Sequence, residues 1–204
     1  MLRVYIDDQE VQPPLPTLRA AIDEARQRAE NAGRLVIEVH ADGAPISNEL
    51  LTSPPDDTAS VDELRFVTTE PGPFIRVTLL DAADSLRQVK ADQDKAAEAL
   101  QAGNIDHAFV ALQGVLNGWA IVREVVEKSG TLAGFDPAEV RLPSGEPGKV
   151  LIDGLAGRLG ELRDSLSNQD WSGLSDLLAY ELDGHCERWA QFLQALADKA
   201  HPAD

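Results

Sequence analysis

The sequence predicts an α+β protein with a small sheet domain, residues 1–70, followed by a helical domain, residues 71–204. Two observations predict this class. The first part alternates short β-branched runs with one amphipathic segment. In the second part, apolar residues recur every three or four positions almost to the C-terminus, as expected of helices that bury one face. Hydrophobic residues make up 43% of the chain, which is enough for a folded core.

The sheet domain combines alternating apolar runs with turn residues and one capped helix. In chain order we expect a strand at Leu2–Ile6, a turn at Asp7–Gln9, a pairing segment at Glu10–Gln12, a helix after Thr17, a strand at Leu35–His40, a hairpin turn at Asp42–Gly43 and a strand at Asp62–Thr69. This β–α–β–β order with a leading hairpin resembles a small β-grasp-like sheet with one helix packed on it.

The helical domain contains four expected helices, at residues 73–102, 105–128, 148–167 and 171–200. The segment Phe74–Leu80 has the composition of a strand, so a strand is the alternative there. Its apolar residues nevertheless continue the helical spacing of the segment that follows, and Pro73 suits the first turn of a helix. We therefore expect a helix. Gly103 ends it, and Asn104 caps the next one.

An internal repeat relates the two halves of the helical domain. A shift of 66 residues places the apolar pattern that begins at Leu86 on the one that begins at Ile152, and both patterns cross a tight turn at the same place. The sequence therefore predicts a duplicated helical hairpin, residues 73–128 and 148–200, that forms an antiparallel four-helix bundle.

Charge and cysteine content limit the classes of partner and the compartment. The net charge of −17 argues against nucleic acids and anionic membrane surfaces, because both attract basic proteins. Cys186 is the only cysteine and forms no disulfide within the chain, which fits the reducing cytoplasm. The N-terminal residues do not resemble a signal peptide, and no run of apolar residues is long enough to predict a membrane span.

The candidate metal or proton-transfer site lies on the last helix. Glu181 and His185 are four residues apart, and Cys186 follows. One interpretation is a small-molecule or metal site, and the other is a core histidine beside a small buried thiol. We expect His185 to be buried and free of metal. The chain has no phosphate-binding loop and no nucleophile elbow, so we expect neither a cofactor nor an enzymatic activity.

Candidate partner-binding residues lie on the second helix. Its main apolar seam passes through Trp119, and four β-branched residues lie off that seam: Val110, Val115, Ile121 and Val125. A helix that is apolar over so much of its circumference needs cover on two sides. The sheet domain could cover one of these sides. If it does not, the sequence predicts a homodimer or a monomer that holds an apolar partner segment. The three tryptophans are expected in the core, with a partner surface as the alternative.

The stretch Asp170–Leu182, together with the strand-to-turn start of the chain, resembles uncharacterised bacterial proteins that pair a small β-rich N-terminal region with acidic helical hairpins. In size, acidity and helical character, the C-terminal half is also similar to flagellar export chaperones. The first resemblance implies no catalytic motif. We expect a non-enzymatic, cytoplasmic protein–protein interaction module of the chaperone or adaptor kind.

Overall fold

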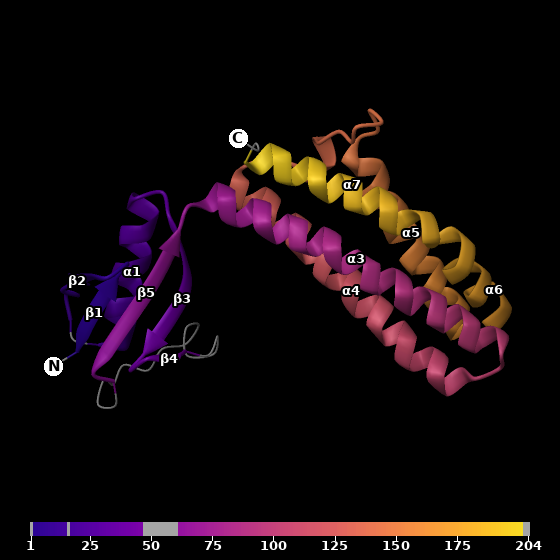
Figure 1. Ribbon diagram of the computed structural model, residues 1–204, viewed down its shortest axis with the longest axis horizontal. Helices are drawn as coiled ribbons and strands as arrows, with labels where there is room; N and C mark the ends of the chain where they lie inside the picture. The colour runs from indigo at the N-terminus through magenta and orange to yellow at the C-terminus, as the bar shows by residue number, and fades with distance from the viewer. Residues whose placement is uncertain (1, 16, 47–60, 202–204) are drawn as a thin grey trace. The chain divides into compact units, whose positions relative to one another are not determined.

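The computed structural model describes residues 2–15, 17–46 and 61–201. It is a mixed α/β protein with a five-stranded sheet in its first part and helices in its second (Figure 1). The chain divides into two compact units, Met1–Phe74 and Ile75–Asp204, here called the sheet unit and the helical unit. Each unit has a buried apolar core of its own. The expected mixture of a sheet with helices is confirmed.

The sheet has the strand order β2-β1-β5-β3-β4. Its strands are β1 (Arg3–Ile6), β2 (Gln9–Val11), β3 (Leu35–Ala41), β4 (Ala44–Pro45) and β5 (Glu63–Thr69). The central pair β1 and β5 is parallel, and the other neighbours are antiparallel. The hairpin turn after β3 is confirmed. The second strand begins at Gln9 instead of the expected Glu10, because the turn before it takes only Asp7 and Asp8.

Helix α1 (Leu18–Asn31) packs on the sheet. Thr17 caps it as expected, since its Oγ1 accepts a hydrogen bond from the backbone N–H of Ala20 at 3.2 Å. The buried face of the helix is small, with three alanines beside Leu18 and Ile22, which allows the helix to lie close to the strands. Its partners in the core include Val4, Leu64 and Phe66. The other side chains of α1 face solvent, apart from a few that are half-buried.

The helical unit is built from long helices joined by short turns and one longer connection. Its elements are α3 (Pro71–Gln101), α4 (Ile105–Ala133), the short turn η1 (Pro137–Glu139), α5 (Gly148–Ser167), α6 (Trp171–Asp176), η2 (Leu177–Glu181) and α7 (Asp183–Ala200). Gly103 adopts a positive φ of 71° between α3 and α4, and Asn104 caps α4, both as expected. The expected third helix is confirmed at both of its ends.

The segment Phe74–Leu80 is helical and forms the first turns of α3, as expected. Ile75 and Leu79 are buried and continue the seam of the helix, whereas Val77 is 56% exposed. The burial therefore follows the helical period and not the two-residue period of a strand. The strand propensity of the β-branched residues in Phe74–Leu80 is overridden, because this segment buries more apolar surface as part of a continuous helical seam than it would as a short strand.

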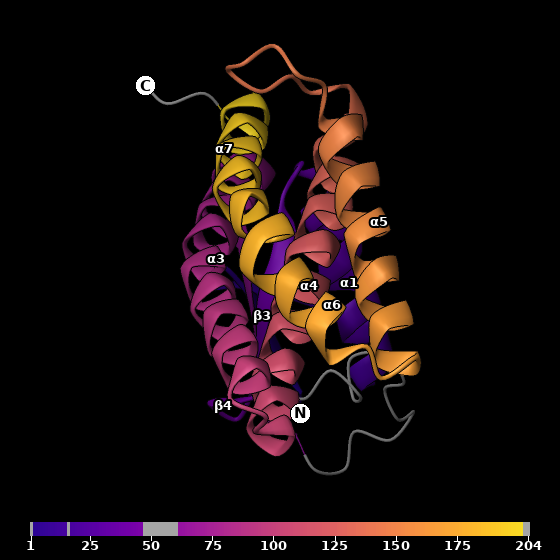
Figure 2. The same cartoon turned by 90° about the vertical axis from the view of Figure 1, so that its right-hand side faces the viewer.

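Helices α3, α4, α5 and α7 run side by side and share one core (Figure 2). The rings of Trp119 and Trp189 meet edge to face in that core, with 5.6 Å between centroids. Gly118 brings α4 close to α3, because a Cβ atom at this position would collide with the side chain of Val89. The expected burial of Trp119 and Trp189 is confirmed, whereas Trp171 is only half-buried.

The expected last helix is not continuous. Residues Leu177–Glu181 form a π-helical turn, which separates α6 from α7. A π-turn holds about one residue more than an α-helical turn. Leu182, Trp189, Phe192 and Leu196 are buried after it, as expected of the seam, but between Leu182 and Trp189 the buried side chain is Cys186, while His185 is only half-buried. The expectation that His185 is buried on the main seam is wrong, because positions three and four residues after Leu182 both fit the helical spacing.

Candidate functional site

The three residues considered as a metal or small-molecule site do not converge. Glu181 is exposed and forms an ion pair with Arg158 of α5. Cys186 lies in the core, 3% exposed, where its Sγ donates to Oε1 of Gln93 at 3.6 Å. Among the described residues there is no group of three or more histidine, cysteine, aspartate or glutamate side chains that could hold a metal ion. The alternative prediction of a site at these residues therefore finds no geometric support.

His185 lies in an environment that disfavours positive charge. Burial lowers its pKa most, and the nearby guanidinium groups of Arg188 and Arg158 lower it further. Its Nδ1 is buried and has no hydrogen-bond partner among the described residues. The ring packs toward α5, where a Cβ atom at Gly154 would lie 3.5 Å from its Cε1. The imidazole is therefore neutral near pH 7, and the two neighbouring cations would also repel a metal ion.

Burial also suppresses the chemistry of Cys186. It raises the pKa of the thiol to about 11, and the nearby charge of Lys90 and the hydrogen bond to Gln93 reduce that rise only in part. The thiolate is the reactive form of cysteine, so this side chain is inert at neutral pH. Cys186 acts as a small buried apolar residue, as the sequence indicated.

The candidate partner-binding residues of α4 fall into two groups. Trp119 and Val115 are fully buried, so they do not belong to a surface that a partner could contact. Val125 is half-buried. Val110 and Ile121 are exposed, at 75% and 57%. Val115 was expected off the seam and Leu116 on it, because positions 115 and 116 lie three and four residues after the buried Leu112. In the structure Val115 is buried and Leu116 is 41% exposed, so the expectation for Val115 is wrong.

Leu132 extends the exposed apolar surface of α4 and was missed by the sequence analysis. It is 48% exposed and lies eleven residues beyond Ile121, which in turn lies eleven residues beyond Val110. Eleven residues are close to three turns of an α-helix, so the three side chains share one side of the helix. The spacing of 11 is the sequence signal that could have found it. We call Val110, Ile121 and Leu132 the α4 strip.

The exposure of apolar side chains is concentrated on α4. Within the described part of the chain, five of the eleven exposed large hydrophobic side chains belong to this one helix: Phe109, Val110, Leu116, Ile121 and Leu132. Phe109 contacts Trp171 edge to face at 6.0 Å, so it is partly covered within the unit. The α4 strip has no such ring contact and is the clearest candidate for an interaction surface.

Helix α4 is also long and apolar enough to cross a membrane by length and composition, alone in this respect among the described helices. By length and composition, α4 therefore departs from the expectation that no segment of the chain could span a membrane. The mean hydropathy of its most apolar window is 1.3, and 33% of that window is buried. Core helices of soluble proteins meet the same two criteria, and α4 has a fully buried seam through Trp119 and Val122.

Comparison with known proteins gives no match to a family model, to a curated protein or to a solved structure.

Proposed function

We propose that the protein is a non-enzymatic, cytoplasmic protein–protein interaction module of the chaperone or adaptor kind, and that a second copy of the chain covers the α4 strip. The observation that carries the proposal is the regular exposure of Val110, Ile121 and Leu132 along one side of α4. Large apolar side chains that recur on one side of a helix are typical of an interface between proteins.

The spacing of the strip favours a second copy because the strip is self-complementary. Val110 and Leu132 lie at equal distances on either side of Ile121. In an antiparallel, two-fold symmetric pair of α4 helices centred on Ile121, the two copies of Ile121 meet each other, and Val110 of each copy faces Leu132 of the other. A two-fold interface uses the same surface of both copies, and it is the commonest arrangement of oligomers.

Charges beside the strip support the same arrangement. In the antiparallel pair, Lys128 of one copy lies opposite Gly114 of the other, since both are seven residues from Ile121. Asp92 of α3 lies directly against Gly114, where a Cβ atom would be 2.7 Å from its Oδ2, and it already pairs with Lys95. Lys128 is 68% exposed and pairs with Glu124 of its own helix. A further contact from Lys128 of one copy to Asp92 of the other would place opposite charges on both sides of the two-fold axis.

The net charge of −17 does not prevent such a dimer. The segment from residue 107 to residue 122 contains no lysine, arginine, aspartate or glutamate, so like charges do not face each other along the first half of the strip. Repulsion between the more distant carboxylates is screened over about 8 Å at physiological ionic strength.

Disulfide trapping tests the proposed symmetry. A cysteine at the two-fold axis approaches its own copy, so the Ile121→Cys variant should form a covalent dimer under mild oxidation. Val150→Cys is the matched control, since Val150 is similarly exposed, at 48%, on α5. The native Cys186 is buried and does not compete. Equal cross-linking of the two variants, or none in Ile121→Cys, would contradict the proposal.

For the finer architecture we propose a β-grasp-like sheet unit and a four-helix bundle of two duplicated hairpins. The caps of the two hairpins support the duplication: Asn104 accepts from the backbone N–H of His107, and Asp170 from that of Gly173. Both members of the second pair lie 66 residues after those of the first, which is the shift that relates the apolar patterns. The resemblance to flagellar export chaperones motivates the chaperone or adaptor role.

A further inference from the structure

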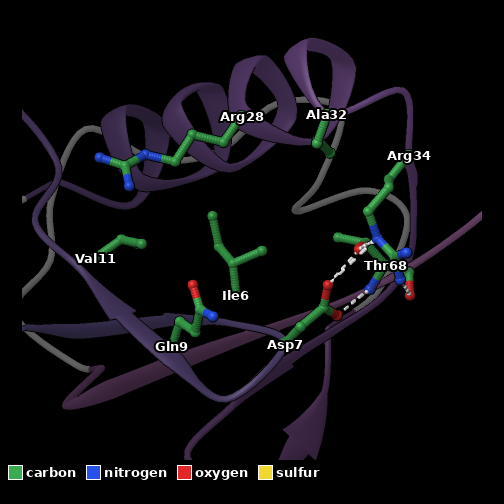
Figure 3. A pocket seen from close by; sticks show the side chains of 9 residues that line it. Ile6, Asp7, Gln9, Val11, Arg28, Ala32, Arg34 and Thr68 are labelled. Atoms are coloured by element: carbon green, nitrogen blue, oxygen red, sulfur yellow. Dashed lines mark hydrogen bonds and ion pairs between the residues drawn. The ribbon is translucent and has the colours of Figure 1, made fainter.

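The sheet unit contains a pocket of about 250 Å³ between the last turn of α1, the β1–β2 hairpin and the end of β5 (Figure 3). Ile6, Val11 and Ala29 give it apolar walls, and Arg28 and Arg34 bring two guanidinium groups to its lining. An apolar concave surface with a few charged groups is the usual form of a small-molecule site. This pocket is independent of the α4 strip.

One end of the pocket is a fixed cluster of polar groups. Oδ1 of Asp7 accepts from the backbone N–H of Thr68 at 2.7 Å, and Oδ2 accepts from its hydroxyl at 2.5 Å. Arg34 donates from Nε to Oγ1 of Thr68 at 2.6 Å and from Nη2 to its carbonyl oxygen at 2.9 Å. Figure 3 shows these three side chains drawn together at this end. The guanidinium of Arg34, which also pairs with Asp7, is thus held in one orientation, and its Nη1 has no hydrogen-bond partner among the described residues.

The turn that carries Asp7 is strained, and the cluster holds it in place. Asp7 and Asp8 have φ values of 48° and 66°, in the left-handed region that a two-residue hairpin turn requires. This conformation is usually supplied by asparagine or glycine, and it costs free energy in other residues. Burial opposes the ionisation of Asp7, but the hydrogen bonds from Thr68 and the charge of Arg34 together lower its pKa. The carboxylate is therefore ionised and satisfied within the protein.

Arg28 provides the second guanidinium, away from this cluster. Its side chain is 49% exposed and reaches along α1 towards Val11 (Figure 3). It pairs through Nε with Glu24 at 2.5 Å, and neither of its Nη groups has a partner within the part of the chain that the structure describes. Gln9 lies between the two arginines in the same view, with its amide directed into the pocket.

The balance of donors and acceptors defines the ligand. The backbone carbonyls of Arg28, Ala29 and Glu30 accept bonds from the N–H groups that end α1, so the carbonyls at this helix end are satisfied. The unused groups are mainly N–H donors of the two arginines. A ligand must therefore bring acceptors, and a carboxylate matches the planar fork of a guanidinium.

We propose that this pocket binds a small monocarboxylate with a short apolar body. The carboxylate binds the unused Nη edge of Arg28, and the apolar body lies against Ile6, Val11 and Ala29. At about 30 Å³ for each water-sized group, the pocket holds about eight non-hydrogen atoms. Hexanoate has this size and serves as the probe, and hexylamine has the same apolar body with the opposite charge.

Titration of the isotope-labelled protein with hexanoate, followed by amide NMR shifts, tests the proposal. We expect saturable shifts at residues 6–9 and 68 with a millimolar dissociation constant, and at least about fivefold weaker binding in Arg28→Gln. Arg28 takes no part in the cluster of Asp7, Arg34 and Thr68, so Arg28→Gln leaves that cluster intact. Arg26→Gln, on α1 but outside the pocket lining, is the control and should bind as the wild type does.

Three results would overturn the proposal: no saturable shifts with hexanoate, equal shifts with hexylamine, or unchanged affinity in Arg28→Gln.

Discussion

The thiol of Cys186 donates to the side-chain carbonyl of Gln93 at 3.6 Å, inside the core of the helical unit. Gln93 is 1% exposed, and its Nε2 has no hydrogen-bond partner among the described residues. The contact joins α3 to α7. The cysteine is therefore placed for packing, and its chemistry follows from that placement.

We predict that Cys186 is unreactive in the folded protein. Because burial raises the pKa of the thiol from its ordinary 9.0 to about 11, the thiolate fraction at pH 8 falls about a hundredfold, and burial blocks access as well. A chromogenic disulfide reagent should label the folded chain far more slowly than the urea-unfolded chain. Equal labelling rates in the two states would contradict the placement of Cys186 in the core.

Acidification should destabilise the protein through His185. Its pKa is lowered in the folded state by burial and by Arg188 and Arg158, so the unfolded chain binds a proton first as the pH falls through 6.5. The contribution of His185 to stability is therefore full above that pH and decreases on acidification towards its lowered folded pKa. Urea unfolding between pH 7.5 and 5 should show a weaker pH dependence in His185→Gln.

His107 provides the control for this titration. It is exposed at the start of α4, and its Nδ1 contacts Asn104. His107→Gln makes the same exchange of side chain at an exposed histidine, and the same flattening in both variants would contradict the assignment to His185.

Two glycines inside helices should respond to alanine in opposite directions. A Cβ atom at Gly118 would collide with Val89, so Gly118→Ala should lower the free energy of unfolding by about 1–3 kcal/mol through overpacking. Gly157 of α5 has no atom within 4 Å of the same position, so Gly157→Ala should raise it by up to about 1 kcal/mol through helix propensity. Denaturant unfolding of both variants measures the change in the free energy of unfolding. Stabilisation of Gly118→Ala would show that α3 and α4 are not in close contact.

Local patterns in the sequence predicted the elements but not all of their faces. The caps Thr17 and Asn104 and the helical nature of Phe74–Leu80 follow from nearby residues, so they could be predicted. The π-turn could not, because one extra residue in a turn leaves the apolar spacing compatible with an ordinary helix. The burial of Cys186 in place of His185 could not be predicted either, because both positions fit the spacing between the buried Leu182 and Trp189. The choice between Val115 and Leu116 likewise depends on which neighbouring helices approach α4.

The pocket of the sheet unit was beyond the reach of sequence patterns for a different reason. Asp7, Arg34 and Thr68 come from three separate segments, and the parallel pairing of β1 with β5 brings two of them together. Pairing between distant strands leaves no local periodicity that identifies the partners. By contrast, the α4 strip is readable once the spacing of 11 is recognised, since all of its members lie on one helix.

The molar mass in solution, measured by light scattering coupled to size-exclusion chromatography, tests the central claim that two copies associate through the α4 strip. At micromolar concentration we expect the wild type to have the mass of a dimer, twice 22.0 kDa. Ile121→Asp places a carboxylate at the two-fold axis facing its own copy, and we expect the mass of a monomer with an unchanged circular dichroism spectrum. Val150→Asp should remain a dimer. A wild type that is monomeric, or a dimer that persists in Ile121→Asp, would contradict the account.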